Sequence, residues 1–411
     1  MGVDGGVGAG VARHASRGVM ADQAAKRAGL RRLLIISIVG RLAHDVSVRL
    51  VYPFTPEIAA GLKIGVDQLG ALLSLRNGVS IVGPLFGAWA DRVGHRRAMT
   101  TGLLLVAVGM GLIGFSAGLI IPALGFVVAG AGSAIYLPAL LAYASERTAY
   151  RSRGRVLGAI ELAWALSGMI GVPVLGLLIA PLGWRAPFAA IAAAAASCAA
   201  LTLLLEETAR AGSALPRFNF GAVLRHRSAL AFIATWFLVF FAFESIQVSY
   251  GSWFERRFGL DAAARGSVQT LFGMFELAAS GGSALFLDRL GKKRGVTGGL
   301  IVVVGGYLLL ATSGQTSLPW ALVSIGLAFV GFEFSVVSGA SVMSELAPAA
   351  RGTMLAFGAA AGSLGRMTAD LAGSAVMASA GFSTVALMSI VAGVLTVLVF
   401  ALGVKERQSA P

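Results

Sequence analysis

Apolar residues in this chain form long unbroken runs separated by short polar segments. A helix rises about 1.5 Å per residue and needs roughly 20 apolar residues to cross the hydrocarbon of a bilayer. The runs are continuous rather than alternating, which favours helices over a β-barrel, because a helix satisfies its own backbone hydrogen bonds in lipid. Twelve membrane-spanning helices are therefore predicted, at about 33–57, 68–90, 98–118, 121–145, 154–180, 185–204, 229–253, 264–287, 295–313, 319–344, 352–377 and 381–404.

Composition supports the same fold class. The 411 residues have a mean hydropathy of +0.82, and 13% of them are charged, whereas charged residues make up about a quarter of a soluble domain. The single cysteine, Cys198, excludes an intrachain disulfide and a cysteine metal cluster. An all-α polytopic membrane protein without metal or cofactor is expected.

The residues behind the net charge of +14 follow the expected membrane topology. They are not gathered into a basic patch of the kind that binds nucleic acid. If the N-terminus is cytoplasmic, 24 Lys and Arg fall in inside segments and 5 in outside segments, as the positive-inside rule requires. Both termini are thus predicted to be cytoplasmic, in an inner membrane. Residues 1–32 lack an A-x-A-type cleavage site after a short apolar core, which favours a polar tail over a signal peptide.

The two halves of the chain are similar at an offset of about 198 residues. "ADRVG" at 90–94 aligns with "LDRLG" at 287–291, and "SERTAYRSRGRVLG" at 145–158 aligns with "SELAPAARGTMLAFG" at 344–358. Two pseudo-symmetric bundles of six helices follow, as parallel repeats. The expected segments are a tail at 1–32, a bundle at 33–204, a linker at 205–228, a bundle at 229–404 and a tail at 405–411.

The segment "GPLFGAWADRVGHRR" at 83–97 resembles the loop motif of the major facilitator superfamily, G-x-L-A-D-R-x-G-R-K, between spans two and three. "YPFTPEIAAGL" at 52–62 is similar to the proline-containing end of the first helix in drug/proton antiporters of that superfamily. The fourth span departs from the antiporter pattern, because Phe126 stands where an Arg precedes the glycine at Gly130. The resemblance implies a twelve-helix transporter that works by alternating access.

The resemblance also implies a conformational latch between the halves. Asp91, at the end of span two, would accept hydrogen bonds from free N–H groups at the start of span eleven near Gly352, and Asp288 would do the same near Gly154. The other expected latch residues are those that allow close approach, a tight turn or a cytoplasmic loop: Gly83, Gly87, Arg92, Gly94, Arg289 and Gly291. The alternative is that these charges only set topology, which explains the loop cations better than it explains the two aspartates.

Ionisable residues inside spans are costly in lipid and are functional candidates for that reason. Those predicted to line a central cavity for protons and substrate are Arg41, His44, Asp45, Arg49, Arg76, Glu244, Glu276, Glu333, Arg366 and Asp370, with the shallower Glu161 as a gate or structural partner. Spans three, six, nine and twelve contain none in their interiors. In the superfamily these are the outer helices, so a polar centre is expected.

In span one, Arg41, Asp45 and Arg49 share one helical face, and Arg76 is expected at the depth of Arg49. One interpretation makes Asp45 the proton-coupling carboxylate, within reach of Arg49 and Arg76. The other makes Asp45 a neutralised structural partner of Arg41 and Arg49, which holds span one to span two. Surplus positive charge there would favour an anionic or zwitterionic substrate.

In the second half, Arg366 and Asp370 are expected to pair with each other, while the three glutamates would suit cations or protons. No G-x-x-x-x-G-K-[ST] loop occurs, so an ion gradient rather than ATP should supply the energy. "GFSAG" at 114–118 has the form G-x-S-x-G but closes an uncharged membrane helix, so a hydrolase is not expected.

The predicted function is secondary active transport, led by proton-coupled export of a small organic molecule. Proton-symport import of an organic anion or sugar is the alternative, and a non-transporting sensor is a third. The expected partners are a small-molecule substrate, protons and the bilayer, with no nucleic acid and a monomeric chain.

Overall fold

The computed structural model describes residues 6–207, 220–347 and 350–405, with side chains for all of these except 6–27, 220, 222 and 284–288. Nearly all described residues are helical. The first half of the chain contains α1 (Gly6–Arg49), α2 (Thr55–Leu62), α3 (Val66–Val79), η1 (Ser80–Val82), α4 (Gly83–Val93), α5 (His95–Gly114), α6 (Ile120–Glu146), α7 (Tyr150–Leu166), η2 (Ser167–Gly171), α8 (Val172–Leu182) and α9 (Arg185–Thr202). The second half contains α10 (Phe220–Leu224), α11 (Arg227–Phe258), α12 (Ala262–Leu290), α13 (Lys292–Ala311), η3 (Ser313–Gln315), α14 (Leu318–Leu346), α15 (Arg351–Ala380) and α16 (Phe382–Gly403).

Each of the twelve predicted runs coincides with helical structure, which confirms an all-α polytopic fold. Among the described residues, nine helices are long and apolar enough to cross a membrane, counting α3 with α4 and α7 with α8 as single spans. The helices α1, α12 and α15 overlap the other three predicted runs. All three carry buried charged residues, so these helices depend on neighbouring helices to cover their polar faces.

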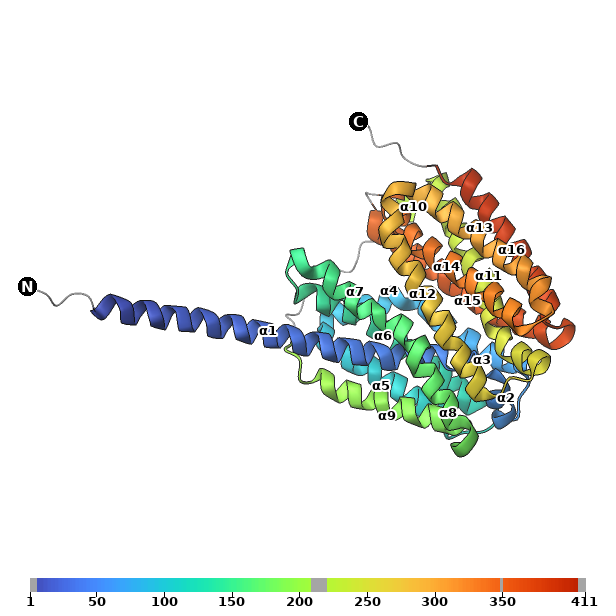
Figure 1. Cartoon of the computed structure of the whole chain (residues 1–411), viewed down its shortest axis with the longest axis horizontal. Coiled ribbons are helices and arrows are strands. Elements are labelled where there is room, and N and C mark those ends of the chain that lie inside the picture. Colours follow the sequence, from blue (N-terminus) through green and yellow to red (C-terminus); the bar gives the residue numbers. More distant parts are fainter. Residues whose placement is uncertain (1–5, 208–219, 348–349, 406–411) are drawn as a thin grey trace, which may run out of the picture.

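Three predicted spans are interrupted. The run at 33–57 ends as α1 at Arg49 and resumes as α2 after a turn, because Pro53 and Pro56 cannot continue the hydrogen-bond ladder of a helix. Pro84 begins α4 after the 3₁₀ turn η1, and a π turn separates α7 from α8 just before Pro173. Residues 6–32 of the expected polar tail are helical, because α1 begins at Gly6 and projects from the bundle (Figure 1).

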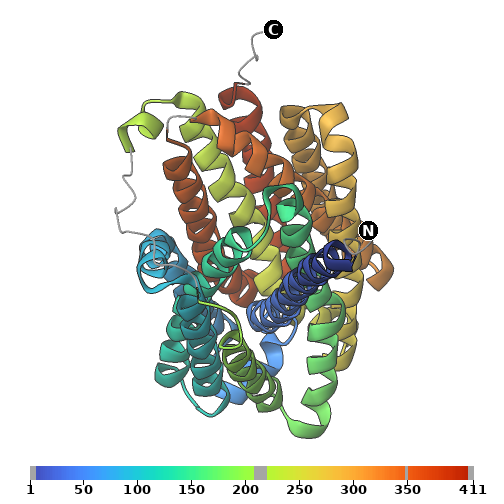
Figure 2. The ribbon, with the colours of Figure 1, turned by 90° about the vertical axis from the view of Figure 1, so that its left-hand side faces the viewer.

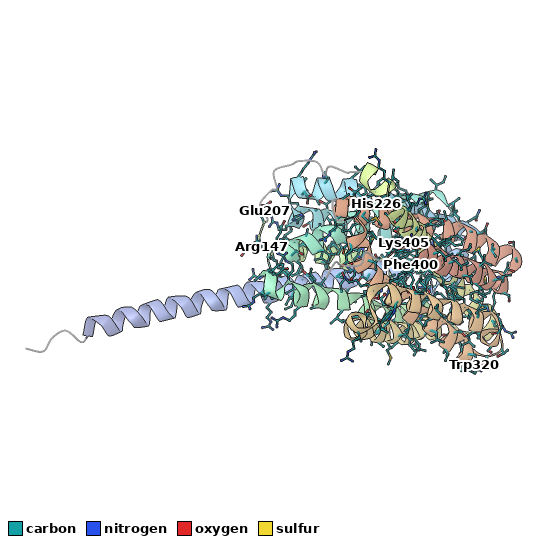
Figure 3. The ribbon with its side chains drawn as sticks, turned by 90° about the horizontal axis from the view of Figure 1, so that it is seen from above. Arg147, Glu207, His226, Trp320, Phe400 and Lys405 are labelled. Carbon is teal, nitrogen blue, oxygen red and sulfur yellow. The ribbon has the colours of Figure 1, made fainter. Side chains whose placement is uncertain are left out.

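The chain forms two helical bundles side by side, α1–α9 and α11–α16 (Figures 1 and 2). We call the end from which α1 projects the termini face and the opposite end the far face. Arg147 and Glu207 lie toward the termini face, whereas Trp320 lies at the other end of the molecule (Figure 3). The expected linker at 205–228 includes α10, and its residues 208–219 lie outside the described residues.

The two bundles are joined toward the far face. There α3 packs on α15, α8 packs on α12, and α2 contacts α11. One buried apolar cluster contains side chains from both halves, among them Phe54 and Phe254. Two further clusters, one around Met99 and one around Met354, each stay within a single half near the termini face. The shared apolar core therefore closes the far face.

Candidate functional site

Arg49 and Glu276 form a buried ion pair between the two halves. Arg49 is the last residue of α1, and its Nη2 donates to Glu276 Oε2 on α12 over 2.6 Å. Both side chains are about 6% exposed. The guanidinium also lies over the ring of Trp164, 3.8 Å from its centroid. A buried, hydrogen-bonded pair of opposite charges holds its partners in one arrangement, because separating them would leave two uncompensated charges.

A second contact between the halves centres on Tyr52. Arg76 on α3 donates to the Tyr52 hydroxyl over 2.8 Å and to the Val48 carbonyl over 3.0 Å. The Tyr52 hydroxyl in turn donates to Glu244 on α11. Arg366 on α15 lies 3.9 Å from the other oxygen of Glu244. This chain of contacts runs from one bundle into the other through a phenol.

A third contact joins α3 to α15. The Asn77 amide donates to Asp370 Oδ2 over 2.6 Å, and the Asp370 side chain is fully buried. The predicted pairing of Arg366 with Asp370 does not form. Arg366 instead lies over the Phe240 ring, 4.4 Å from its centroid, and beside Glu244. Arg366 and Asp370 therefore each contact a residue on another helix rather than each other, one turn apart on α15.

A fourth contact lies at the far face and was missed by sequence reasoning. Arg265 on α12 is 0% exposed and pairs with Glu57 on α2. Arg265 falls inside the predicted run 264–287. A charged residue at that position was a signal that other parts of the protein must shield its side chain from lipid. Asn77 was also missed, because a lone amide in an apolar run gives no charge signal.

Asp45 lies in a separate cluster within the first half. Arg41 Nε donates to Asp45 Oδ2 over 2.7 Å, and His44 Nδ1 lies 2.8 Å from Asp45 Oδ1. Arg41 also reaches Glu161, which is half-exposed, over 3.1 Å. Arg49 was predicted to lie beside Asp45 but bonds elsewhere, because the other bundle supplies a closer acid.

The charges of the two halves are complementary where they meet. The predicted surplus of positive charge around span one is reduced, since Glu276 compensates Arg49 and Asp45 compensates Arg41, whereas Arg76 bonds to the Tyr52 hydroxyl and the Val48 carbonyl. Glu333 accepts a hydrogen bond from Ser280 over 2.9 Å, and no basic side chain pairs with it among the described residues. In the Arg49–Glu276 pair the first half supplies the cation and the second half the acid, whereas in the Arg265–Glu57 pair at the far face the roles are reversed.

The predicted latch contact of Asp91 is absent in this conformation. Asp91 is 52% exposed and lies 3.1 Å from His95 of its own loop, which in turn lies 3.1 Å from Glu146. The helix α4 packs on α5 and α6 rather than on α15. The physical reason is that the halves are joined at the far face, so their termini-face ends stay apart. The latch remains a prediction for another conformation.

The other latch residues are placed consistently with that conformation. A Cβ added at Gly83 or Gly87 would meet nothing within 4 Å, so neither allows a close helix contact here. Gly94 and Gly291 have φ of +94° and +80°, the turn conformation expected of them. Arg92 is exposed. The Asp288 side chain lies outside the described residues, and Arg289 is exposed beside it.

Twelve predicted spans in two bundles, joined by charged pairs that cross between them, define a polytopic membrane transporter. The family model described as Major Facilitator Superfamily matches residues 37–367, and the chain belongs to that family.

Similar proteins agree with this assignment. Over 318 residues the chain is 22% identical to Multidrug resistance protein 2 of Bacillus subtilis (strain 168), covering 74% of this chain and 78% of that one. It is 24% identical over 305 residues to Tetracycline resistance protein, class E of Escherichia coli, covering 71% and 75%. Its fold resembles a crystal structure of a mutant of the nucleoside transporter NupG, with a TM-score of 0.76, 16% identity, and coverage of 91% and 100%. The protein is a multi-pass membrane transporter of this superfamily.

Proposed function

We propose that this protein exports a small organic molecule in exchange for protons, by alternating access of the two bundles. Its similarity to multidrug and tetracycline resistance proteins supports export. The buried acids Glu244, Glu276 and Asp370, all on the second half and all in contact with the first, support proton coupling. We further propose that it works as a monomer and performs no covalent chemistry on its substrate.

The observation that carries this proposal is the ion pair of Arg49 with Glu276. The far face opens only if α1 and α12 move apart, and that movement separates the two charges. Protonation of Glu276 removes one of the charges before the pair separates, which lowers the cost of separation. A proton bound there would thus favour opening of the far face.

The positive-inside distribution supports a cytoplasmic termini face. The far face is then external, and the described conformation is closed to the outside. In the opposite conformation α4 approaches the start of α15, and Asp91 meets the free N–H groups there. Asp288 meets the start of α7 in the same way. These two contacts form when the four contacts between the halves, which keep the far face closed, are broken.

The substrate proposed is zwitterionic. An anionic or zwitterionic substrate was predicted from surplus positive charge, and acids compensate Arg49 and Arg41 in this conformation. Glu333 and Arg366 are both partly exposed, on α14 and α15 of the same half. An amine and a carboxylate on one small molecule would satisfy both side chains without leaving net charge in the membrane.

The test is transport into inside-out vesicles, using a substrate identified first by a thermal-shift screen of zwitterions, organic anions, amphiphilic cations, sugars and peptides. For a proton-coupled exporter, an acidic lumen should drive substrate into the vesicle. A proton symporter would expel substrate under the same gradient, which would overturn the proposed direction.

Glu276→Gln should abolish the gradient-driven accumulation while sparing exchange of labelled for unlabelled substrate. The matched control is Glu255→Gln, which removes an exposed carboxylate near the far face. If Glu276→Gln still accumulates substrate as the parent protein does, Glu276 is not the coupling acid.

A further inference from the structure

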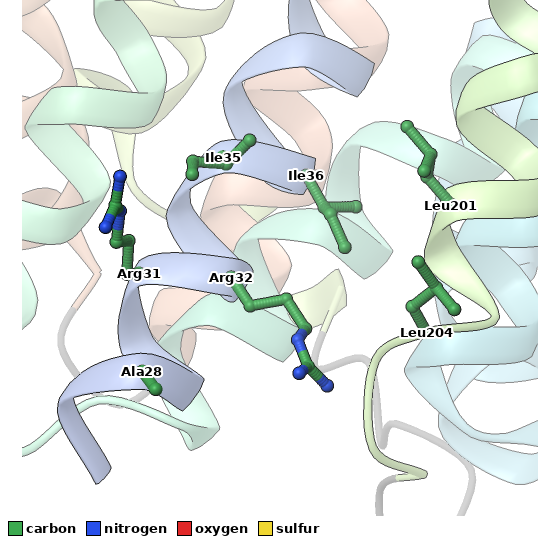
Figure 4. A pocket seen from close by; sticks show the side chains of 7 residues that line it. All are labelled: Ala28, Arg31, Arg32, Ile35, Ile36, Leu201 and Leu204. Carbon is green, nitrogen blue, oxygen red and sulfur yellow. The ribbon is translucent and has the colours of Figure 1, made fainter. Parts of the chain in front are cut away.

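A groove lies outside the contact between the halves, at the termini face of the first bundle (Figure 4). Its volume is about 600 Å³. It is formed by the start of the buried part of α1 and by the end of α9 with the turn that follows. Its lining side chains are Arg31, Arg32, Ile35, Ile36, Leu201 and Leu204. None of these residues takes part in the contacts described for transport.

The groove is basic at one end and apolar along its length. Arg32 and Ile36 on α1 face Leu201 and Leu204 across the groove, and Arg31 and Ile35 lie on the adjacent side of α1 (Figure 4). The apolar walls are open, since Ile35 is 52% exposed and Leu204 58% exposed. Each arginine precedes one of the isoleucines by about one helical turn. Both arginines lie just before the start of the predicted span at 33–57.

The two arginines have no partner among the residues that the structure describes. Both are exposed, and no ion pair or hydrogen bond joins Arg31 or Arg32 to another of the described residues. Nearby arginines of the same face are paired, for example Arg97 with Glu207 over 2.7 Å. Two unpaired cations above an open apolar groove are complementary to an anion that carries a hydrocarbon chain.

We propose that this groove binds an anionic glycerophospholipid from the leaflet at the termini face. The phosphate group lies against the two arginines, and an acyl chain lies along Ile35, Ile36, Leu201 and Leu204. Basic residues at the end of a span attract anionic lipid, and their stems extend to headgroup depth. A soluble substrate would lack the chain that the apolar walls accommodate. This inference is independent of the proposed substrate and coupling ion.

The bound lipid would connect the groove to the loop before α5. Arg96 donates to the carbonyls of Leu203 and Leu205, over 3.3 and 3.2 Å, and so holds the end of α9. Thr100 on α5 lies 2.6 Å from Thr202 on α9. A lipid that joins α1 to α9 at this point therefore also restrains the turn between α5 and α4, the helix that carries Asp91.

The experiment uses the full-length protein in detergent, titrated with phosphatidylglycerol or phosphatidylcholine and followed by native mass spectrometry and thermal unfolding. Phosphatidylglycerol should bind and raise the melting temperature more than phosphatidylcholine does. Arg31→Ala/Arg32→Ala should weaken phosphatidylglycerol binding by roughly tenfold or more. Arg151→Ala/Arg155→Ala, which removes two exposed arginines of α7, is the matched control and should bind as the parent protein does.

Three results would overturn the proposal: unchanged phosphatidylglycerol binding in the double variant, equal binding of the two lipids, or the same stabilisation by inorganic phosphate alone. If the alanine variant does not fold, Arg31→Gln/Arg32→Gln keeps the side-chain length and tests the charge alone. A groove variant, Leu204→Asp, should also lose the phosphatidylglycerol effect. Retention of that effect by both the glutamine and the Leu204 variants would equally exclude the site.

Discussion

Arg49 on α1 donates to Glu276 on α12 over 2.6 Å, although 227 positions separate them in the chain. The pair is a buried ionic link between the two bundles, with both side chains about 6% exposed. It is accompanied by Tyr52 with Glu244 and Asn77 with Asp370. Opposite charges of the two bundles thus meet in pairs, Arg49 with Glu276 and Glu57 with Arg265, and these pairs stabilise the conformation in which the far face is closed.

Removing one member of this pair should destabilise the protein strongly. We expect Glu276→Ala or Arg49→Ala to cost about 3–5 kcal/mol, because each leaves a buried charge without its partner. The double variant should cost clearly less than the sum of the two single variants. Thermal and denaturant unfolding of the purified variants measure these values. Strict additivity would mean that the two side chains do not interact in the membrane.

A methyl group at Gly70 should force the far face open. A Cβ there would lie 1.9 Å from the Ser374 hydroxyl and 2.5 Å from the backbone oxygen of Asp370. We expect Gly70→Ala to destabilise the closed far face by about 1–3 kcal/mol. Spin labels at Lys63 and Glu255, both exposed near that face, would report a longer distance.

The matched control for Gly70→Ala is Gly87→Ala, because nothing lies within 4 Å of a Cβ at Gly87 in this conformation. It should leave the distance between the two labels unchanged or favour the closed far face further. An increase in that distance equal to the one caused by Gly70→Ala would contradict both assignments.

Asp91→Asn should slow transport while leaving the stability of the protein almost unchanged. The carboxylate is 52% exposed and contacts His95 at 3.1 Å, so its loss should cost less than about 1 kcal/mol in this conformation. Transport should nevertheless slow several-fold, because the opposite conformation loses its latch. Initial rates of substrate exchange, together with the melting temperature, test this. The control is Glu146→Gln, which contacts the same histidine; equal slowing by both variants would assign the effect to the loop alone.

Asp45→Asn should lower stability by about 2–4 kcal/mol, because Arg41 keeps only the half-exposed Glu161 as an acidic partner. On this basis exchange and gradient-driven transport should fall together. Both are measured in the same vesicles, with the melting temperature as the reference. Loss of driven transport with exchange preserved would instead make Asp45 the proton-coupling carboxylate.

The local interruptions of the spans could be predicted only in part. Pro53 and Pro56 mark the break after α1, since proline cannot supply the required N–H group. The continuation of α1 back to Gly6 carried no comparable signal, because residues 1–32 lack the apolar run on which span prediction depends. Helix formation and membrane crossing are separate properties of a sequence.

By itself the sequence determined the twelve spans, the two related halves and the set of buried charges, because apolar runs and ionisable residues are local features of the chain. Tertiary structure alone decided the partners of those charges. Arg366 could reach Asp370 on its own helix, yet it lies beside Glu244, and Asp370 bonds to Asn77 from the other bundle. The physical reason is that pairing depends on which helices lie together in one conformation. In the alternating mechanism that we propose, one sequence must encode both sets of partners.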